Sequence, residues 1–148
     1  GTMERARLQE HLNFIASELH NAFTPLFNNQ AAEVEKNAAP DRIARRLDEV
    51  EAMLADGRPY LLGESFSVAD IYLFVVAGWT KPTNIGLDRW PHLRAHFERI
   101  AARPAVQAAM LAEAFQVSGH PELMAQYRDQ AITAFRFAQR QQRQHDAL

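Results

Sequence analysis

A stripe of neutral polar side chains near the start of the chain comprises Asn13, Ser17, His20, Asn21 and Thr24. On a helix that turns about 100° per residue, these positions fall within roughly one third of the circumference, almost opposite Leu8, Ile15, Leu19 and Leu26. Such a face offers amides, hydroxyls and one imidazole as hydrogen-bonding groups. The alternative interpretation is a solvated helix face that binds nothing.

Ser67 and Asp70 are two polar residues in an otherwise apolar stretch, which could indicate a nucleophile beside a carboxylate. No histidine stands near them in the sequence to serve as a base. Their spacing of three residues, directly before an apolar run, is instead that of a capping box, in which each side chain bonds the backbone amide of the other residue. We therefore assign Ser67 and Asp70 a structural role.

His92 and His96 stand four residues apart in an expected helix, a spacing that can bind a metal ion. No cysteine and no nearby carboxylate completes a tetrahedral ligand set around them. The sequence therefore predicts no metal site.

The elements that must position these side chains are all expected to be helices, because strand and hairpin signals are scarce and strong helix formers dominate most windows. Apolar residues recur at helical spacing from about residue 3 to 28, and Pro25 could kink or end this helix. Further helices are expected from Pro40 to about Gly57, from Val68 to about Trp79, from Pro91 to about 103, from Ala105 to about Phe115 and from about Glu122 to about Arg143. This pattern predicts an all-α fold.

The helix from Val68 to Trp79 is apolar on nearly every side, as a central helix surrounded by others would be. It should form the core of the domain. Trp79 at its end either fills core volume, the simpler interpretation, or lines a substrate pocket.

Composition excludes several classes of function. The 148 residues carry a net charge of −2 without a long run of one sign, which argues against a nucleic-acid binder, and contain no cysteine, which excludes disulfides and thiolate catalysis. The longest apolar stretch, from Ile71 to Ala77, is far shorter than the roughly 20 residues that cross a bilayer. No apolar segment follows the charged N-terminus, so no secretory signal is expected and the cytoplasm is the expected location.

Three segments, taken in order, resemble a known family. They are Glu10 to His20, the capping-box segment Tyr60 to Tyr72, and Trp90 to Val106. Together they are similar to the C-terminal domain of glutathione S-transferases, especially the bacterial beta class. The resemblance implies a helical bundle of five to six helices over residues 1–115. Residues 116–148, an expected additional helix and a tail, go beyond it.

The resemblance also implies a set of substrate-binding residues. Positions matching Asn13, Ser17 and Glu18 help to hold the glutamyl end of glutathione bound to the partner subunit. The position matching His20 lies beside the sulfur and the acceptor substrate, and Trp79 could line the same pocket. Where the family usually has lysine, this chain has Asn21, which removes a positive charge that would stabilise a thiolate.

Family members carry a thioredoxin-like domain ahead of this region, and no βαβ pattern occurs in these 148 residues. The expected function is therefore the acceptor-substrate side of a transferase and much of its dimer contact, with no catalytic residue assigned and no catalysis by the chain alone. Glutathione would be a co-substrate only where a thioredoxin-like domain is supplied. Helix surface that the family buries against that domain would drive self-association, so a homo-oligomer is expected.

A second hypothesis comes from a different class of function. The chain would be a stand-alone interaction or scaffold module, binding a protein partner through the exposed inter-domain face or through residues 116–148. A third is a non-catalytic binder of a small molecule between helices.

Overall fold

The computed structural model of the chain describes residues 1–118, with side chains as far as residue 113. By its internal contacts the chain divides into two compact units, Gly1–Ile100 and Ala101–Leu148. Helices make up every regular element of the described part: α1 (Met3–Phe14), η1 (Ile15–His20), α2 (Asn21–Phe27), α3 (Glu33–Leu54), α4 (Val68–Gly78), α5 (Pro91–Ala101) and α6 (Pro104–Ser118). The predicted all-α fold is confirmed.

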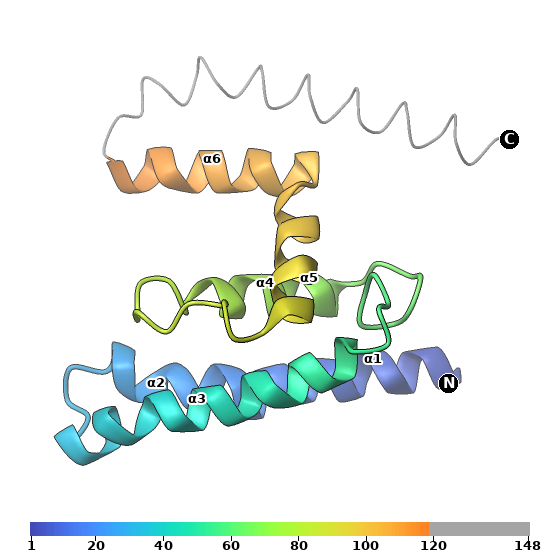
Figure 1. Ribbon diagram of the computed structural model, residues 1–148. Helices are drawn as coiled ribbons and strands as arrows, with labels where there is room; N and C mark the ends of the chain where they lie inside the picture. The colour runs from blue at the N-terminus through green and yellow to red at the C-terminus, as the bar shows by residue number, and fades with distance from the viewer. Residues whose placement is uncertain (119–148) are drawn as a thin grey trace, which may run out of the picture. The chain divides into compact units, whose positions relative to one another are not determined.

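The first predicted helix is one continuous rod built from α1, η1 and α2, shown in blue in Figure 1. Its middle part, η1, is a π-helix, in which each turn is wider than in an α-helix. Pro25 lies inside α2 and does not end the helix, which continues to Phe27. Ile15, Leu19 and Phe23 of this rod are fully buried, as their helical spacing predicts.

The second helix, α3, corrects the prediction that a helix begins at Pro40. It begins at Glu33 and contains Pro40 in its interior. The Glu35 carboxylate accepts a hydrogen bond from the Ala32 amide at 3.3 Å, and Ala39 is fully buried. These contacts and the good helix formers of this stretch outweigh the one backbone hydrogen bond that proline removes.

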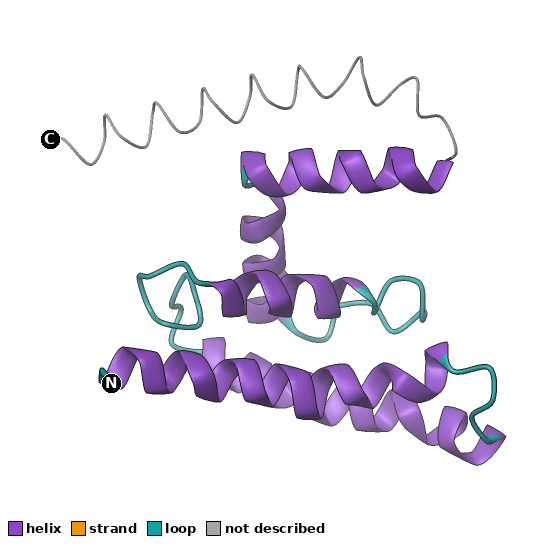
Figure 2. Ribbon diagram, turned by 180° about the vertical axis from the view of Figure 1, so that it is seen from behind, coloured by secondary structure: helices purple, strands orange, loops and turns teal. Residues whose placement is uncertain are grey.

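The apolar helix α4 lies against the α1 and η1 parts of the rod, as Figure 2 shows. Leu73, Val76 and Ala77 are completely buried there. They pack in one cluster with Ile43 and Leu47 of α3 and the buried residues of the rod. The prediction of α4 as the core helix is confirmed, and its bounds agree with the predicted ones to within a residue.

Two carboxylates of α3 hold the start of α5. Glu51 accepts hydrogen bonds from the backbone amides of His92 and Leu93 at 3.0 and 2.9 Å, so it caps a helix from another element. Burial raises the pKa of Glu51. The hydrogen bonds from these amides and from the His92 ring together lower it by more, so the pKa lies below its ordinary value. Asp48 accepts from the indole of the buried Trp90 at 2.8 Å.

Pro104 was predicted to end one helix and to start the next. In the structure, α5 ends at Ala101 and α6 begins at Pro104. The helix predicted from Glu122 to Arg143 lies outside the described residues, as does most of the segment 116–148. Among residues 1–118, no helix is both long and apolar enough to span a bilayer.

Candidate functional site

A pocket of about 390 Å³ opens where the rod ends beside the C-terminus of α4. Its walls are His20 at the end of η1, Thr24 and Phe27 of α2, Asn28 and Trp79. The volume suits a small organic molecule, and two aromatic rings with a few polar groups are a common lining for such a site. The pocket is therefore the first candidate for binding in the described part of the chain.

The His20 imidazole is fixed in the wall of this pocket by two neighbours from α4. Its Nδ1 lies 2.9 Å from the Tyr72 hydroxyl, which is a hydrogen bond. Its ring meets the Trp79 ring edge to face, with 4.8 Å between centroids. Trp79 in turn contacts the rings of Phe23 and Phe27 at 5.7 and 5.4 Å. The imidazole is thus held between a hydroxyl and an aromatic cluster.

Of the polar stripe, His20 and Thr24 line this pocket, and Asn13, Ser17 and Asn21 do not. The Ser17 hydroxyl donates to the Asn13 carbonyl at 2.8 Å, and the Asn13 side chain accepts from Gln9 at 3.2 Å. Asn13, Ser17 and Asn21 are exposed. Because the π-helical turn rotates the residues after it relative to those before it, the wheel drawn for an ideal α-helix overstated how closely Asn13 and His20 share a face.

Glu18 has a partner within the chain. Its carboxylate lies 2.7 Å from the Arg46 guanidinium, which also pairs with Glu49 at 2.5 Å. These carboxylates raise the pKa of Arg46, mainly through the hydrogen bond to Glu49. Glu18 and His20 therefore have different partners in this structure, Arg46 for Glu18 and Tyr72 for His20. The roles of Asn13, Ser17, Glu18 and Asn21 toward glutathione remain predictions.

Sequence reasoning missed Tyr72 as the partner of His20, and Phe27 and Asn28 as lining residues of the pocket. Tyr72 precedes Trp79 by seven residues, which places both on one face of α4, and this spacing was the available signal. Phe27 carried no signal of its own, since only the end of the rod brings it to Trp79. Trp79 is half-buried against the core and also lines this pocket. Its role toward a substrate remains a prediction.

Asp70 forms its half of the predicted capping box with the Ser67 amide, and it has a further partner that the sequence did not indicate. The Asp70 carboxylate accepts from the Ser67 amide and hydroxyl at 2.8 and 2.9 Å, from the Leu61 amide at 2.8 Å and from His96 Nε2 at 3.0 Å. Burial raises the pKa of Asp70, but these hydrogen bonds, the one from His96 first, bring it below its ordinary value.

The two histidines considered for a metal have other partners. His96 is 1% exposed and bound to Asp70, whereas His92 Nδ1 lies 2.7 Å from Glu51. Within residues 1–118, no three potential ligands gather around a point that could hold a metal ion.

The helical bundle and its capped core helix define a class of domain. The model of the "Glutathione S-transferase, C-terminal domain" family matches residues 14–104. The chain belongs to this family, and the resemblance seen in its three sequence segments is confirmed.

Two relatives with known names come from bacteria. The chain is 37% identical over 112 residues to glutathione S-transferase GstA of Escherichia coli O157:H7, covering 76% of this chain and 55% of the relative. Glutathione S-transferase GST-4.5 of Xanthomonas campestris pv. campestris is 34% identical over 116 residues, covering 74% and 56%. The chain thus spans about half the length of the curated relatives it matches.

Solved structures give the same result. The ternary complex of BphK, a bacterial glutathione S-transferase, superposes with a TM-score of 0.73 at 50% identity, covering 77% of this chain and 56% of that one. The bacterial beta-class enzyme of Sphingomonas chungbukensis gives 0.72 at 43% identity, covering 76% and 56%. A sphingomonad glutathione S-transferase complexed with glutathione gives 0.72 at 42%, covering 77% and 56%. The beta-class likeness is confirmed.

Proposed function

We propose that this chain supplies the acceptor-substrate side of a glutathione transferase active site, with the pocket at His20 as the acceptor pocket. The observation that carries the proposal is the placement of the His20 imidazole, between the Tyr72 hydroxyl and the Trp79 ring, in the wall of a pocket that also contains Phe27. An electron-poor aromatic acceptor would stack on such rings while one polar group contacts the reacting atoms.

The hydrogen bond to Tyr72 gives His20 a defined role in this proposal. When the Tyr72 hydroxyl donates to Nδ1, the neutral imidazole carries its proton on Nε2. That N–H is then available to a thiolate sulfur or to the negative charge that develops on the acceptor. A donor fixed in advance stabilises such charge without having to reorganise during the reaction.

The group that activates the thiol of glutathione is proposed to come from a thioredoxin-like domain, because no lysine or arginine is among the described residues that line the His20 pocket. Asn21, where the family usually has lysine, supports this division of roles. The residues matching Asn13, Ser17 and Glu18 would then contact the glutamyl end of glutathione across a dimer.

A calorimetric titration tests this division. Glutathione is expected to give no binding heat with the 148-residue chain alone and a saturable heat once a beta-class thioredoxin-like domain is present. Binding by the chain alone would contradict the proposal, since the polar stripe would then be a sufficient site. Silence in both titrations would also contradict it and would favour the interaction module.

We also propose that the chain self-associates. Val68 and Val75 of α4, seven residues apart on one face of the helix, are 59% and 47% exposed, and Phe66 is exposed just before them. Light scattering is expected to give a mass of two or more chains that falls toward one chain when both valines are replaced by aspartate. A monomeric mass for the unaltered chain at high concentration is the result that would reject self-association.

The same exposed valines are what favours the alternative function, a stand-alone interaction module. Apolar side chains left uncovered on a core helix fit a protein partner as well as a second domain. In that case deletion of residues 116–148, or the two aspartate substitutions, would abolish capture of a discrete partner, and the His20 pocket would be irrelevant to it.

A further inference from the structure

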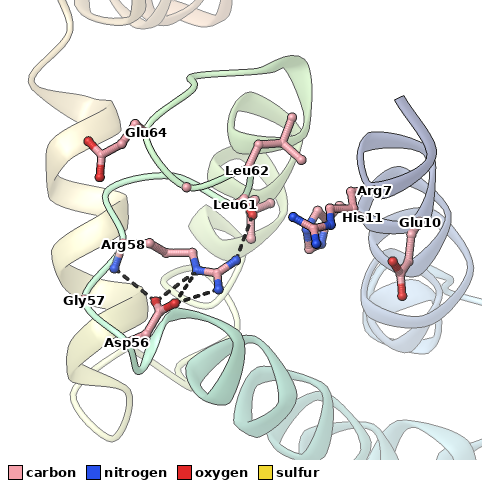
Figure 3. Close-up of a pocket in the computed structure, with 10 residues that line it drawn as sticks. Arg7, Glu10, His11, Asp56, Gly57, Arg58, Leu61, Leu62 and Glu64 are labelled. Carbon is pink, nitrogen blue, oxygen red and sulfur yellow. Dashed lines mark hydrogen bonds and ion pairs between the residues drawn. The ribbon is translucent and has the colours of Figure 1, made fainter. Parts of the chain in front are cut away.

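A second pocket, of about 590 Å³, lies between the middle and last turns of α1 and the loop that joins α3 to α4. Figure 3 shows Arg7, His11 and Glu10 on the helix side and Asp56, Arg58 and the residues around Gly63 on the loop side. No residue lines both this pocket and the one at His20. The acceptor pocket proposed above therefore does not account for it.

The loop side of this pocket is fixed by hydrogen bonds. Arg58 donates from Nε and Nη2 to the Asp56 carboxylate, at 2.9 and 2.6 Å, and from Nη1 to the Leu61 carbonyl at 3.4 Å. The Leu61 amide is in turn held by the buried Asp70 at 2.8 Å. The bond from Arg58 lowers the pKa of Asp56 to about 2, and the same bond raises the pKa of Arg58. Both groups stay charged at neutral pH.

Arg58 still has hydrogen-bonding capacity toward the pocket. A guanidinium carries five N–H groups in a planar fork, and the bonds to Asp56 and Leu61 occupy three of them. In Figure 3 its end points from the loop toward α1. A planar donor group held in one orientation is the arrangement that recognises a carboxylate or a phosphate.

The helix side presents two more nitrogen groups to the same space. Arg7 and His11 are four residues apart, so they share a face of α1, and Figure 3 shows both pointing toward the loop. In the described part of the chain, neither side chain has an ion-pair or hydrogen-bond partner. Arg7 and Arg58 thus face each other from two elements. Arg58 is already paired with Asp56, whereas Arg7 has no paired carboxylate among the described residues and can attract an anion.

Acidic residues also belong to this pocket and limit what can enter it. Glu10 lies below Arg7 and His11, and Glu64 lies on the side of the loop that is farthest from α1 (Figure 3). Asp56 is neutralised by Arg58. The positive groups therefore meet near the centre, and the two free carboxylates lie away from them.

We propose that this pocket binds a small molecule through a single carboxylate or phosphate group, held between Arg58 on the loop and Arg7 with His11 on α1. The volume leaves room for the rest of such a molecule beside Leu61 and Leu62. Glu10 and Glu64 would exclude ligands whose negative charge spreads beyond this group.

Titrations of the full chain with inorganic phosphate and with acetate, followed by NMR, test the proposal. At least one of the two is expected to bind saturably and to shift the amide signals of α1 and of residues 56–64. Arg7→Gln is expected to weaken that binding about tenfold, since a charge-assisted hydrogen bond is lost. Arg45→Gln, the same change at an exposed residue of α3, should leave it unaltered.

Glu10→Gln supplies an opposite-sign test, because removal of a nearby carboxylate should tighten the binding of an anion. The proposal is rejected if neither anion saturates, or if Arg7→Gln and Arg45→Gln weaken binding equally, which would indicate general charge attraction. Arg7 is exposed and has no ion-pair or hydrogen-bond partner among the described residues, so Arg7→Gln should fold like the unaltered chain.

Discussion

Replacing Asp70 by alanine should lower the free energy of unfolding by about 3–5 kcal/mol, because it removes one member of a buried charged network. Asp70 is 0% exposed, and its carboxylate is the acceptor for the Leu61 and Ser67 amides, the Ser67 hydroxyl and His96. Alanine leaves these buried donors without a partner. The helix α4 also loses its cap. Urea unfolding followed by circular dichroism measures the difference.

Matched variants separate the network from a general effect of charge. Asp41→Ala removes an exposed carboxylate from α3 and should change the stability by less than about 0.5 kcal/mol. Asp70→Asn keeps the shape but turns one acceptor oxygen into a donor facing other donors, so it should cost about 1–3 kcal/mol. A loss for Asp70→Ala no larger than that for Asp41→Ala would show that the network does not hold α4 in place.

The same network predicts a dependence of stability on pH. The pKa of Asp70 in the folded chain lies below its ordinary value of 3.8, so this carboxylate stabilises the fold above that value. The stabilisation is lost as the pH falls through the lower, folded-state pKa. Unfolding free energies measured from pH 6 downward should therefore fall less steeply for Asp70→Ala than for the unaltered chain.

The local half of this network could be predicted from the sequence, and the distant half could not. Ser67 and Asp70 are three residues apart, and a capping box depends only on that spacing. His96 is 26 residues from Asp70 and reaches it only after α4 and α5 have packed. The spacing of His92 and His96 raised the question of a metal site instead. Spacing within one helix cannot show that a residue has its partner on another helix.

The same limit applies to the candidate site. Helical spacing was sufficient to place His20 and Trp79 on helices that could carry a pocket, and the family resemblance supplied the reason to pair them. Neither the spacing nor the resemblance showed that Tyr72 fixes the His20 imidazole or that Arg46 pairs with Glu18, since both contacts join separate elements. The predicted start of α3 was wrong because Pro40 was taken as the first residue of the helix, whereas α3 contains Pro40 in its interior.

Replacing His20 by alanine should have the largest effect on activity under the proposed function. In the chain paired with a beta-class thioredoxin-like domain, kcat/KM for conjugation of a chlorinated nitrobenzene is expected to fall about 10²-fold, the usual loss for one positioned hydrogen-bond donor. His92→Ala, which changes a histidine bound to Glu51 that lines neither pocket, should leave kcat/KM unaltered. Initial rates over a range of acceptor concentrations give the comparison.

Tyr72→Phe distinguishes a positioned donor from a ring that merely fills space. The substitution keeps the aromatic ring beside His20 and removes only the hydroxyl that lies 2.9 Å from Nδ1. If the hydroxyl sets the tautomer of the imidazole, kcat should fall while KM for the acceptor stays the same, because the pocket walls formed by Phe27 and Trp79 are intact. His20→Gln, which keeps an N–H donor, should recover part of the rate lost in His20→Ala. Equal rates for His20→Ala and the unaltered chain would mean that the imidazole only packs against Trp79, and the pocket would then lose its proposed catalytic part.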